Sequence, residues 1–361
     1  MIQLQPENKH CNCKLTVYAC QPDEALLFRR YARPYKLELS LYEQPVSAEN
    51  ANLAAGSRCI SICHTVPVTA CILDKLRDVG VRHISTRSIG CDHIDIHYAN
   101  KIGISVSNVR YSPDGVADYT LMLILMAARR VTSVLQHDIP YSGHRGRPGH
   151  DLSGLTVGVA GTGRIGRAVI HRLRGFGCRI LAYDICQDST LMPYSNYVDR
   201  DTLLSQSDIL TLHMPATDAT YHWIDRCSLA AMKRGSLLIN TARGALVDSY
   251  ALIETLERGE VGGAALDVLE GETDIQNCEP KERVFRSGAL TRLREMPNVI
   301  LTPHTAFYTE HAVEEMVENS IKNCWRYENQ ILSVQSLCQC EEQERFSCFD
   351  RQRHNRYEGG L

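Results

Sequence analysis

One stretch of sequence decides the fold of this chain: Leu155-Thr156-Val157-Gly158-Val159-Ala160-Gly161-Thr162-Gly163-Arg164-Ile165-Gly166. Its first six residues form a short apolar run, which is typical of a buried strand. The next six match the pattern Gly-x-Gly-x-x-Gly, and an amphipathic segment, Ile165–Phe176, continues until Gly177 ends it. A strand, a glycine fingerprint and a helix in this order predict a Rossmann-like unit that binds a dinucleotide.

The three glycines have separate expected roles in that unit. Gly161 allows a tight turn, Gly163 allows pyrophosphate to approach the backbone, and Gly166 allows the helix to pack closely on the strand. The phosphates would meet the backbone N–H groups around Arg164 and Ile165, because the positive end of the helix dipole lies there.

A carboxylate at the end of the second strand indicates which dinucleotide binds. The strand Arg179–Tyr183 is followed by Asp184, which stands 18 residues past Gly166 (184 − 166). A carboxylate at this spacing accepts hydrogen bonds from the adenosine ribose and repels a 2′-phosphate. The next residues, Ile185-Cys186-Gln187, include no Arg or Lys for such a phosphate, so the sequence favours NAD over NADP.

Six short apolar runs, including the two strands above, each stop at a glycine or a polar residue that could take part in chemistry. Runs of this length are typical of a parallel sheet buried on both faces, and ligands of such sheets bind at the carboxyl ends of the strands. The sequence therefore predicts an α/β fold with its site at one edge of the sheet. The runs are Leu155–Ala160, Arg179–Tyr183, Asp208–Leu212, Ser236–Asn240, Gly263–Leu266 and Asn298–Pro303, and the residues that follow them are Gly161, Asp184, His213, Thr241, Asp267 and His304.

The first third of the chain predicts a second module of alternating strands and helices. After it comes a helix, Val116–Arg130, that is apolar on almost every face. Such a helix is buried all round, either between two domains or also against a second subunit. Glu310–Glu328 predicts a helix that returns to the first module, and the polar residues 338–361 predict a mobile tail. The expected strands of the first module are Lys14–Cys20, Leu37–Tyr42, Arg58–His64, Val81–Thr86 and Ile102–Ser105, and its expected helices are Pro22–Tyr31 and Leu73–Val79.

Composition limits the class of protein. A length of 361 residues with 44% hydrophobic content supports two domains with separate cores. The formal net charge of −3 gives no reason to expect nucleic acid or an anionic membrane as a partner. The longest apolar stretch, Leu121–Ala128, is too short to span a bilayer, and the first residues lack a signal-peptide pattern, so we expect a cytoplasmic protein.

The 15 cysteines are scattered, and we expect thiols in a reducing compartment. Cys11-x-Cys13 and Cys338-x-Cys340 do not have the usual zinc spacing and lie in polar end segments. We therefore expect no metal site.

Three residues form a candidate catalytic set. Arg243 and His304 directly follow strand ends, and Glu272 stands five residues past Asp267 (272 − 267). Arginine binds carboxylates through two parallel hydrogen bonds, and a histidine beside a carboxylate is the usual proton donor near neutral pH. Taken singly, each could be a surface ion pair, a solvated loop charge or a structural histidine. Their joint placement beside a dinucleotide site favours catalysis.

The motifs that surround these residues resemble the D-isomer-specific 2-hydroxyacid dehydrogenases. Together with the glycine fingerprint they cover nearly the whole chain in the right order, and within the family the chain resembles most the D-lactate dehydrogenases, including the vancomycin-resistance type. The motifs are Asn240-Thr241-Ala242-Arg243-Gly244, Ala264–Glu272 and Thr302-Pro303-His304-Thr305-Ala306-Phe307, with Arg87–Asp95, Tyr111-Ser112-Pro113, Arg174–Cys178 and His304–Glu310 in support.

The resemblance implies a role for each member of the catalytic set. Arg243 would bind the substrate carboxylate and carbonyl. His304 would protonate the carbonyl oxygen as hydride arrives, and Glu272 would hydrogen-bond His304 and keep it charged. The backbone N–H groups of Ile89 and Gly90 would bind the substrate carboxylate.

The resemblance also implies the walls of the pocket and the cofactor groove. Tyr111 and Phe307 would enclose the substrate side chain, and Asp267 would contact the nicotinamide side of the cofactor. Thr220 stands where related chains often carry Asn, which alters one cofactor contact. The remaining groove residues would be Thr241, Ala242, His213, Met214 and Pro215.

The family arrangement implies a substrate domain of residues 1–113 and 305–337, with the NAD-binding domain, 114–304, inserted between them. It also implies a homodimer formed through Val116–Arg130. The expected activity is NAD-dependent reduction of a small 2-keto acid, pyruvate first, to the D-2-hydroxy acid. The alternatives are a D-2-hydroxyisocaproate or 3-phosphoglycerate type of dehydrogenase, or a nicotinamide-sensing binding protein like the corepressors that share this fold.

Overall fold

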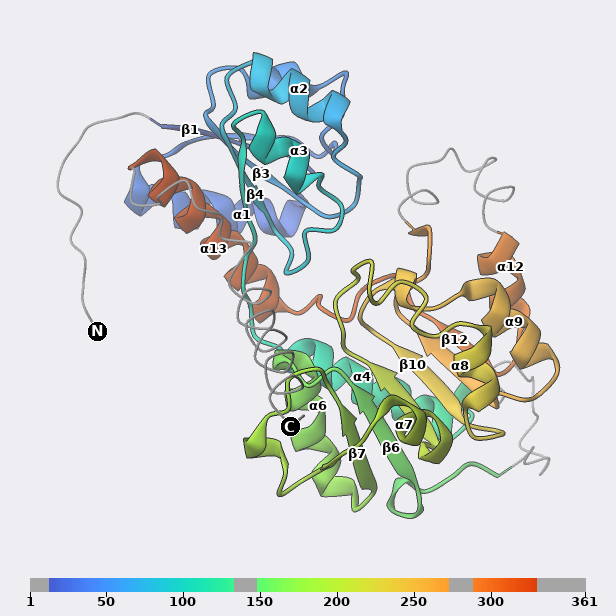
Figure 1. Ribbon diagram of the computed structural model, residues 1–361. Helices are drawn as coiled ribbons and strands as arrows, with labels where there is room; N and C mark the ends of the chain where they lie inside the picture. Colours follow the sequence, from blue (N-terminus) through green and yellow to red (C-terminus); the bar gives the residue numbers. More distant parts are fainter. Residues whose placement is uncertain (1–12, 133–147, 273–287, 330–361) are drawn as a thin grey trace, which may run out of the picture. The chain divides into compact units, whose positions relative to one another are not determined.

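The computed structural model describes residues 13–132, 148–272 and 288–329 (Figure 1). These residues divide into two units. Unit 1 contains residues 13–111 and 310–329, and unit 2 contains residues 112–132, 148–272 and 288–309. Each unit has one parallel sheet, so the predicted α/β fold is confirmed. The predicted tail, 338–361, lies outside the described residues.

Unit 1 is built on a five-stranded sheet with the order β2-β1-β3-β4-β5. Its strands are β1 (Lys14–Val17), β2 (Glu38–Leu41), β3 (Cys59–Ile62), β4 (His83–Thr86) and β5 (Ser105–Ser107), and its helices are α1 (Pro22–Ala32), α2 (Ala70–Asp78), α3 (Ile96–Lys101) and α13 (Glu310–Glu328). Helices α1 and α13 cover one face (Figure 1), where Phe28, Val317 and Ile321 pack on the sheet. Leu73 of α2 and Ala99 of α3 pack on the other face, so both faces are buried.

The last strand of unit 1 differs from the prediction. The sequence predicted this strand at Ile102–Ser105, but β5 begins at Ser105. Ile102 instead ends α3, a short helix that was not predicted, and Gly103 makes the turn with a φ of +82°. Ile104 is fully buried without being in a strand. The apolar run therefore reflects burial of a turn, which short runs do not distinguish from a strand.

Unit 2 is built on a seven-stranded sheet with the order β12-β11-β10-β9-β6-β7-β8. All six predicted strands are present, and β8 is an additional two-residue strand at the edge, too short to show a pattern. The strands are β6 (Thr156–Ala160), β7 (Arg179–Tyr183), β8 (Asn196–Tyr197), β9 (Ile209–Leu212), β10 (Leu237–Asn240), β11 (Gly263–Leu266) and β12 (Val299–Leu301). The helices are α4 (Asp114–Ala128), α6 (Arg164–Leu173), α7 (Arg200–Gln206), α8 (Arg226–Ala231), α9 (Ser249–Glu257) and α12 (Gly288–Glu295).

Two hydrophobic clusters lie on opposite faces of this sheet. On β9, Ile209 belongs to the cluster with α4 and α6, whereas Leu210 and Leu212 belong to the cluster with α7, α8 and α9. Alternate residues of one strand thus enter different cores, which is why the strands of this sheet are apolar without alternation.

In the single chain, helix α4 is buried on most of its faces but not on all of them. Ala117, Leu123 and Ile124 are buried against the sheet and α6. Met122, however, is 39% exposed in the single chain. The apolar pattern was correct, but one face of the helix has no covering element among the described residues of unit 2.

The strand orders fix where ligands can bind. In unit 2 the direction of winding reverses between β6 and β9, and in unit 1 it reverses between β1 and β3. Open α/β sheets bind ligands outside the carboxyl ends of the strands at such reversals. In unit 2 the glycine fingerprint and His213 follow the two strands at this point.

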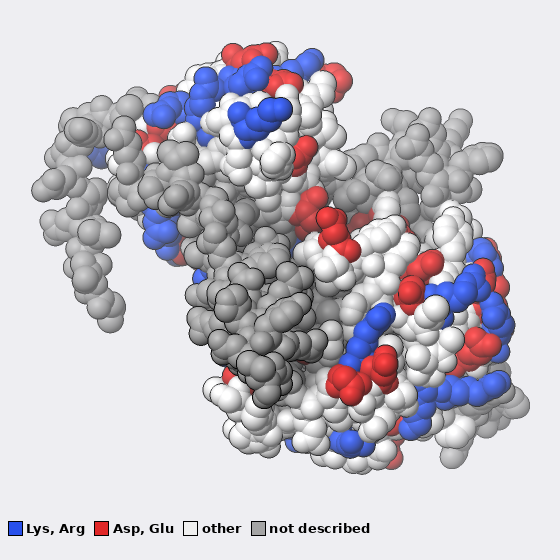
Figure 2. Space-filling view, viewed as in Figure 1, with Lys and Arg blue, Asp and Glu red and all other residues white. Residues whose placement is uncertain are grey.

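The described surface carries charges of both signs. Figure 2 shows Lys and Arg side chains interspersed with Asp and Glu on the face in view. On α8, α9 and α12, Arg226 pairs with Glu254 at 2.7 Å and Arg292 with Glu257 at 2.6 Å. Exposed pairs of this kind contribute little to stability. Among the described helices, none combines the length and the apolar character needed to cross a membrane.

Candidate active site

The glycine fingerprint packs against the end of β9 without room for side chains. A Cβ at Gly161, whose φ is +93°, would lie 2.6 Å from the carbonyl oxygen of His213. A Cβ at Gly166 would lie 1.9 Å from the carbonyl oxygen of Gly161. Only glycine fits these positions, and Gly163 then begins α6 without a side-chain cap. The first turn of α6 therefore offers backbone N–H groups to an anion, as a pyrophosphate requires.

Asp184 lies beside the fingerprint, at the end of β7. Its Oδ2 accepts hydrogen bonds from the backbone N–H of Thr162 at 2.6 Å and from the Thr162 hydroxyl at 3.2 Å. Its Oδ1 accepts from the N–H of Cys186 at 3.0 Å. The structure thus brings the carboxylate and the glycine loop together, in the arrangement that binding of an adenosine ribose needs.

The segment after β9 lines the same edge. Burial lowers the pKa of His213 to about 3, so its ring is neutral. Its Nε2 lies 3.0 Å from the Thr211 hydroxyl, and its buried Nδ1 makes no hydrogen bond with any described residue. Met214 is buried, whereas Pro215 is exposed. An orphaned polar atom beside a glycine loop fits a site that a polar ligand completes.

Thr220 closes its own loop. Its hydroxyl donates to the carbonyl of Pro215 at 2.6 Å and accepts from the N–H of Thr217 at 2.9 Å. The predicted cofactor contact of Thr220 therefore competes with bonds that the loop already makes.

The turn after β10 positions Arg243. The side chain of Asn240 donates to the carbonyl of Arg243 at 2.8 Å and accepts from the N–H of Ala242 at 3.0 Å. Thr241 points into unit 2, where its hydroxyl lies 2.8 Å from that of Thr120 on α4. A Cβ at Gly244 would lie 2.1 Å from the carbonyl carbon of Leu269, so this turn packs directly on the loop that carries Glu272.

Asp267 holds the loop that carries the candidate proton donor. Its carboxylate, in a residue only 1% exposed, accepts from the Thr302 hydroxyl at 2.6 Å and from the N–H groups of Thr305 and Ala306 at 3.0 and 2.9 Å. The resemblance implied a contact of Asp267 with the nicotinamide. These bonds shape the loop, and residues 305–309 lie in unit 2 with Asp267. The contact with the nicotinamide stays a prediction.

His304 and Glu272 form a close pair. Nδ1 of His304 lies 2.7 Å from Oε1 of Glu272, and both side chains are mostly buried, with 18% and 23% exposed. Oε2 of Glu272 accepts from the N–H of Leu269 at 3.0 Å. The ring of Phe307 meets that of His304 edge-on, with centroids 6.1 Å apart. A carboxylate on Nδ1 fixes the tautomer and leaves Nε2 as the nitrogen that can transfer a proton.

In unit 1 a loop follows the carboxyl end of β4, and the carbonyl groups of residues 88–90 in this loop all accept hydrogen bonds from other protein groups. The carbonyl of Ser88 accepts a hydrogen bond from the backbone N–H of Val109. The carbonyl of Ile89 accepts one from the Asn108 side chain at 2.7 Å, and the carbonyl of Gly90 accepts one from the Ser88 hydroxyl at 2.7 Å. Among the described residues, none accepts a hydrogen bond from the N–H of Ile89 or of Gly90. Two adjacent unpaired N–H groups in a half-buried loop are typical of an anion-binding site.

Residues 121–306 match the family model described as D-isomer specific 2-hydroxyacid dehydrogenase, NAD binding domain. A D-specific alpha-keto acid dehydrogenase of Enterococcus faecium is 48% identical over 321 residues, which cover 88% of this chain and 98% of that protein. The chain belongs to the D-isomer-specific 2-hydroxyacid dehydrogenase family. This D-2-hydroxyacid dehydrogenase is an NAD-dependent oxidoreductase that acts on CH–OH groups, as the sequence predicted.

Other relatives of this D-2-hydroxyacid dehydrogenase, similar to it in sequence or in structure, also carry the names of 2-hydroxyacid dehydrogenases or 2-keto acid reductases. A D-lactate dehydrogenase of Lactiplantibacillus plantarum is 36% identical and covers 86% of this chain and 95% of its own length. The solved pyruvate reductase of Chlamydomonas reinhardtii superposes with a TM-score of 0.80 at 31% identity, over 88% of this chain and 97% of that one. A solved D-2-hydroxyisocaproate dehydrogenase superposes with a TM-score of 0.78 at 31% identity, over 89% and 98% of the two chains.

Two buried polar residues lie next to the loop of Ile89 and Gly90, and the sequence predicted no role for them in this D-2-hydroxyacid dehydrogenase. Arg87 and Glu24 form a buried ion pair beneath the loop of Ile89, at 2.8 Å. The signal for this ion pair in the sequence was an arginine directly after the buried strand His83–Thr86, but nothing in the sequence identified Glu24 as its partner.

Tyr111, predicted for the substrate pocket, is buried in unit 1. Within the described ranges, no group of three or more His, Cys, Asp or Glu residues could hold a metal.

Proposed function

We propose that this enzyme reduces a small unphosphorylated 2-keto acid, with pyruvate as the first candidate, to the D-2-hydroxy acid. The observation that carries the proposal is the His304–Glu272 pair, 2.7 Å apart. It stands after β12, at the edge of the sheet where the glycine fingerprint also lies. A histidine held by a carboxylate beside a dinucleotide site is suited to protonate a carbonyl oxygen during reduction.

The cofactor would be held by residues already described. The fingerprint and the start of α6, around Arg164 and Ile165, would bind the phosphates, and Asp184 would bind the adenosine ribose. His213, Met214 and Pro215 would line the groove with Thr220, Thr241 and Ala242. Bound NADH supplies the hydride that reduces the carbonyl carbon.

The chain's own residues would direct the proton. His304 would hold it at Nε2 and donate it to the carbonyl oxygen, because Nδ1 faces Glu272. The negative charge of Glu272 stabilises the protonated imidazole before transfer. In the reverse direction the neutral Nε2 would accept the proton of the hydroxyl group.

The substrate would be oriented through its carboxylate. The guanidinium of Arg243 would bind the carboxylate and carbonyl, and the N–H groups of Ile89 and Gly90 would bind the carboxylate as well. Tyr111 and Phe307 would enclose the side chain with apolar surface, which disfavours a phosphate. Several fixed contacts leave one face of the carbonyl toward the hydride, so a single enantiomer forms.

We also propose a cytoplasmic homodimer formed through α4. The exposed Met122 and the partly buried Leu125 and Met126 give this helix apolar surface that a second copy would cover. Cys20, Cys59 and Cys324 are buried thiols, as is typical of a protein in a reducing compartment.

The substrate is tested with a panel of 2-keto acids. Purified protein and NADH are incubated with pyruvate, 2-ketobutyrate, 2-ketoisocaproate, phenylpyruvate, hydroxypyruvate and a phosphorylated 2-keto acid, and the products are separated by chiral chromatography. We expect the highest kcat/KM with pyruvate or a slightly larger acid, and only D products. Formation of L-lactate, or a preference for the phosphorylated acid, would contradict the proposal. Binding of NADH without turnover of any acid would instead support a nicotinamide-sensing protein.

A further inference from the structure

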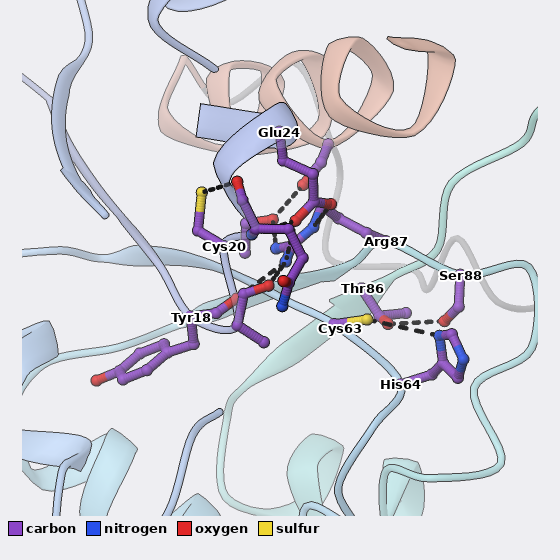
Figure 3. Close-up of polar contacts among 12 residues, drawn as sticks. Tyr18, Cys20, Glu24, Cys63, His64, Thr86, Arg87 and Ser88 are labelled. Carbon is purple, nitrogen blue, oxygen red and sulfur yellow. Dashed lines mark hydrogen bonds and ion pairs between the residues drawn. The ribbon is translucent and has the colours of Figure 1, made fainter. Parts of the chain in front are cut away.

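Arg87 is a buried charge directly before the loop that carries Ile89 and Gly90. Its side chain is 1% exposed. Figure 3 shows its guanidinium between α1 and the ends of the strands, where Nε donates to Glu24 at 2.8 Å. Nη2 donates to the carbonyl groups of Tyr18 and Ala19, at 2.9 Å each. One side chain thus joins the end of β1 and the start of α1 to the end of β4.

The hydrogen bonds continue from Arg87 through the interior of unit 1 and return to the same loop. Nη1 of Arg87 donates to Ser61 on β3, and the network ends where Nδ2 of Asn108 donates to the carbonyl of Ile89 at 2.7 Å. The intermediate residues are Ser320, Ser85 and Asn323, with distances from 2.7 to 3.4 Å. A single hydrogen-bond network therefore holds the loop of Ile89 and Gly90 at two places: at Arg87, which directly precedes it, and at the carbonyl of Ile89.

This network is an unusual way to stabilise a fold. Removing two charges from water costs several kcal/mol per ion, and well-packed apolar residues of similar volume are often at least as stabilising. The Arg87–Glu24 pair is thus weak evidence for stability. Its donors and acceptors have fixed directions, however, and directional bonds specify the orientation of a loop more narrowly than apolar packing does.

We propose that Arg87, with Glu24 and Asn108, is a positioning device that aims the N–H groups of Ile89 and Gly90 at the carboxylate of the keto acid. In a trans peptide the C=O and the following N–H lie in one plane and point in opposite directions. Because the carbonyl groups of Ser88 and Ile89 are bound to the protein, the directions of the Ile89 and Gly90 N–H groups are fixed. The inference rests on the proposed function, because it takes the ligand of these N–H groups to be a 2-keto acid. Arg87 would touch neither substrate nor cofactor.

The test separates positioning from stability. In the Glu24→Leu/Arg87→Met double variant, apolar residues replace the ion pair, so the fold is expected to persist. We expect KM for pyruvate and Ki for oxamate, a 2-keto acid analogue, to rise about tenfold or more, the loss expected when a bound loop is released. KM for NADH should be unchanged, since the cofactor site is in unit 2. An unchanged Ki for oxamate in the folded double variant would overturn the proposal.

A milder variant keeps the proposal testable if the double variant does not fold. Asn108→Ala removes the bond to the carbonyl of Ile89 and leaves the ion pair in place, and it should also raise KM for pyruvate. The matched control is Thr16→Val, which removes a buried 2.8 Å hydrogen bond to Ser57 elsewhere in unit 1. The control should lower thermal stability without changing KM for pyruvate. Equal KM values in Asn108→Ala and Thr16→Val would show that the network has only a structural role.

The experiments distinguish a failure of the proposed function from a failure of the positioning role. If the unmodified protein forms no D-hydroxy acid from any member of the panel, the proposed function is wrong. If the unmodified protein reduces pyruvate and the folded variants bind oxamate as tightly as it does, only the positioning role is wrong. Oxamate binding is measured by calorimetry in the presence of NADH, so this reading does not depend on turnover.

Discussion

His304 has a backbone conformation that most residues avoid. Its φ is +53°, in the left-handed region, which costs a residue with a Cβ about 1–2 kcal/mol. The three bonds that Asp267 accepts from residues 302–306 hold this conformation. The position of the candidate proton donor is thus determined by a buried carboxylate on the neighbouring strand end.

The role of His304 predicts a large effect on turnover. We expect His304→Ala to lower kcat by roughly 10²–10⁴-fold, the contribution of a positioned proton donor. Glu272→Gln keeps the shape beside His304 but removes the charge, so a smaller loss is expected. The control is His311→Ala, which removes an exposed histidine that faces Glu315 on α13. Steady-state kinetics with pyruvate and NADH measures all three, and a nearly unchanged kcat in His304→Ala would exclude the proton-donor role.

Cys63 is expected to be more reactive than its neighbour Cys20. Its Sγ lies 3.6 Å from Nδ1 of His64 (Figure 3). Burial raises the pKa of the Cys63 thiol, but the hydrogen bond to His64 and the positive charges of His64 and Arg87 outweigh it, and the pKa is lowered overall. Burial raises the pKa of Cys20 to about 11.

We expect iodoacetamide near neutral pH to alkylate Cys63 before Cys20, because the thiolate is the nucleophile. Peptide mass spectrometry over time gives the two rates. His64→Ala should slow labelling of Cys63 only. Faster labelling of Cys20 would show that access, not ionisation, controls the reaction.

His83 makes the stability of unit 1 depend on pH. Burial lowers its pKa to about 4, and its ring nitrogens lie 2.8 Å from the Ser105 hydroxyl and 3.0 Å from that of Ser107. The unfolded chain, with an ordinary histidine pKa near 6.5, binds more protons between these values, so stability falls as pH drops from about 6.5 toward 4.

This contribution amounts to roughly 2 kcal/mol between pH 7 and pH 5. We expect His83→Gln to be less stable at pH 7 but to lose less stability on acidification. Denaturant unfolding at the two pH values measures the difference. An equal loss in both proteins would mean that His83 is protonated in the folded state.

At the scale of elements, we expect β6, α6 and β7 to select the cofactor. Asp184 is held by two hydrogen bonds from Thr162, so a 2′-phosphate would meet a fixed negative charge. We expect the Asp184→Ser/Ile185→Arg variant to shift preference toward NADPH by about tenfold or more, since it removes a negative charge and adds a positive one. The ratio of kcat/KM for NADH and NADPH measures the shift. An unmodified protein that uses both cofactors equally would contradict the role of Asp184.

At the scale of the whole molecule, the exposed face of α4 predicts self-association. We expect Met122→Glu to convert a dimer into a monomer, because a charge would be buried in an apolar interface. Met192→Glu is the matched control, since Met192 is 54% exposed elsewhere in unit 2 and Met122 is 39% exposed. Light scattering after size exclusion gives the mass of each variant. A monomeric unmodified protein would remove the basis for an α4 interface.

Several features of this protein were determined by its sequence alone. The order of strand, glycine fingerprint and helix fixes the first unit of the dinucleotide fold, because strand period, glycine turns and helix ends are local properties. Asp184, Arg243 and His304 were predicted as site residues because each stands shortly after the end of a strand, and parallel strands bring their carboxyl ends to one edge. The family motifs added Ile89 and Gly90, which the local pattern did not identify.

Other features were decided only by the tertiary structure. Asp267 follows its strand just as Asp184 does, yet its carboxylate is turned into the loop of His304 because three donors converge on it there. The apolar α4 has an exposed face because no described part of its unit covers Met122. The partner of Arg87 is Glu24, 63 residues away in the chain. A sequence shows which groups can form such bonds, but the choice of partner depends on which segments the fold brings into contact.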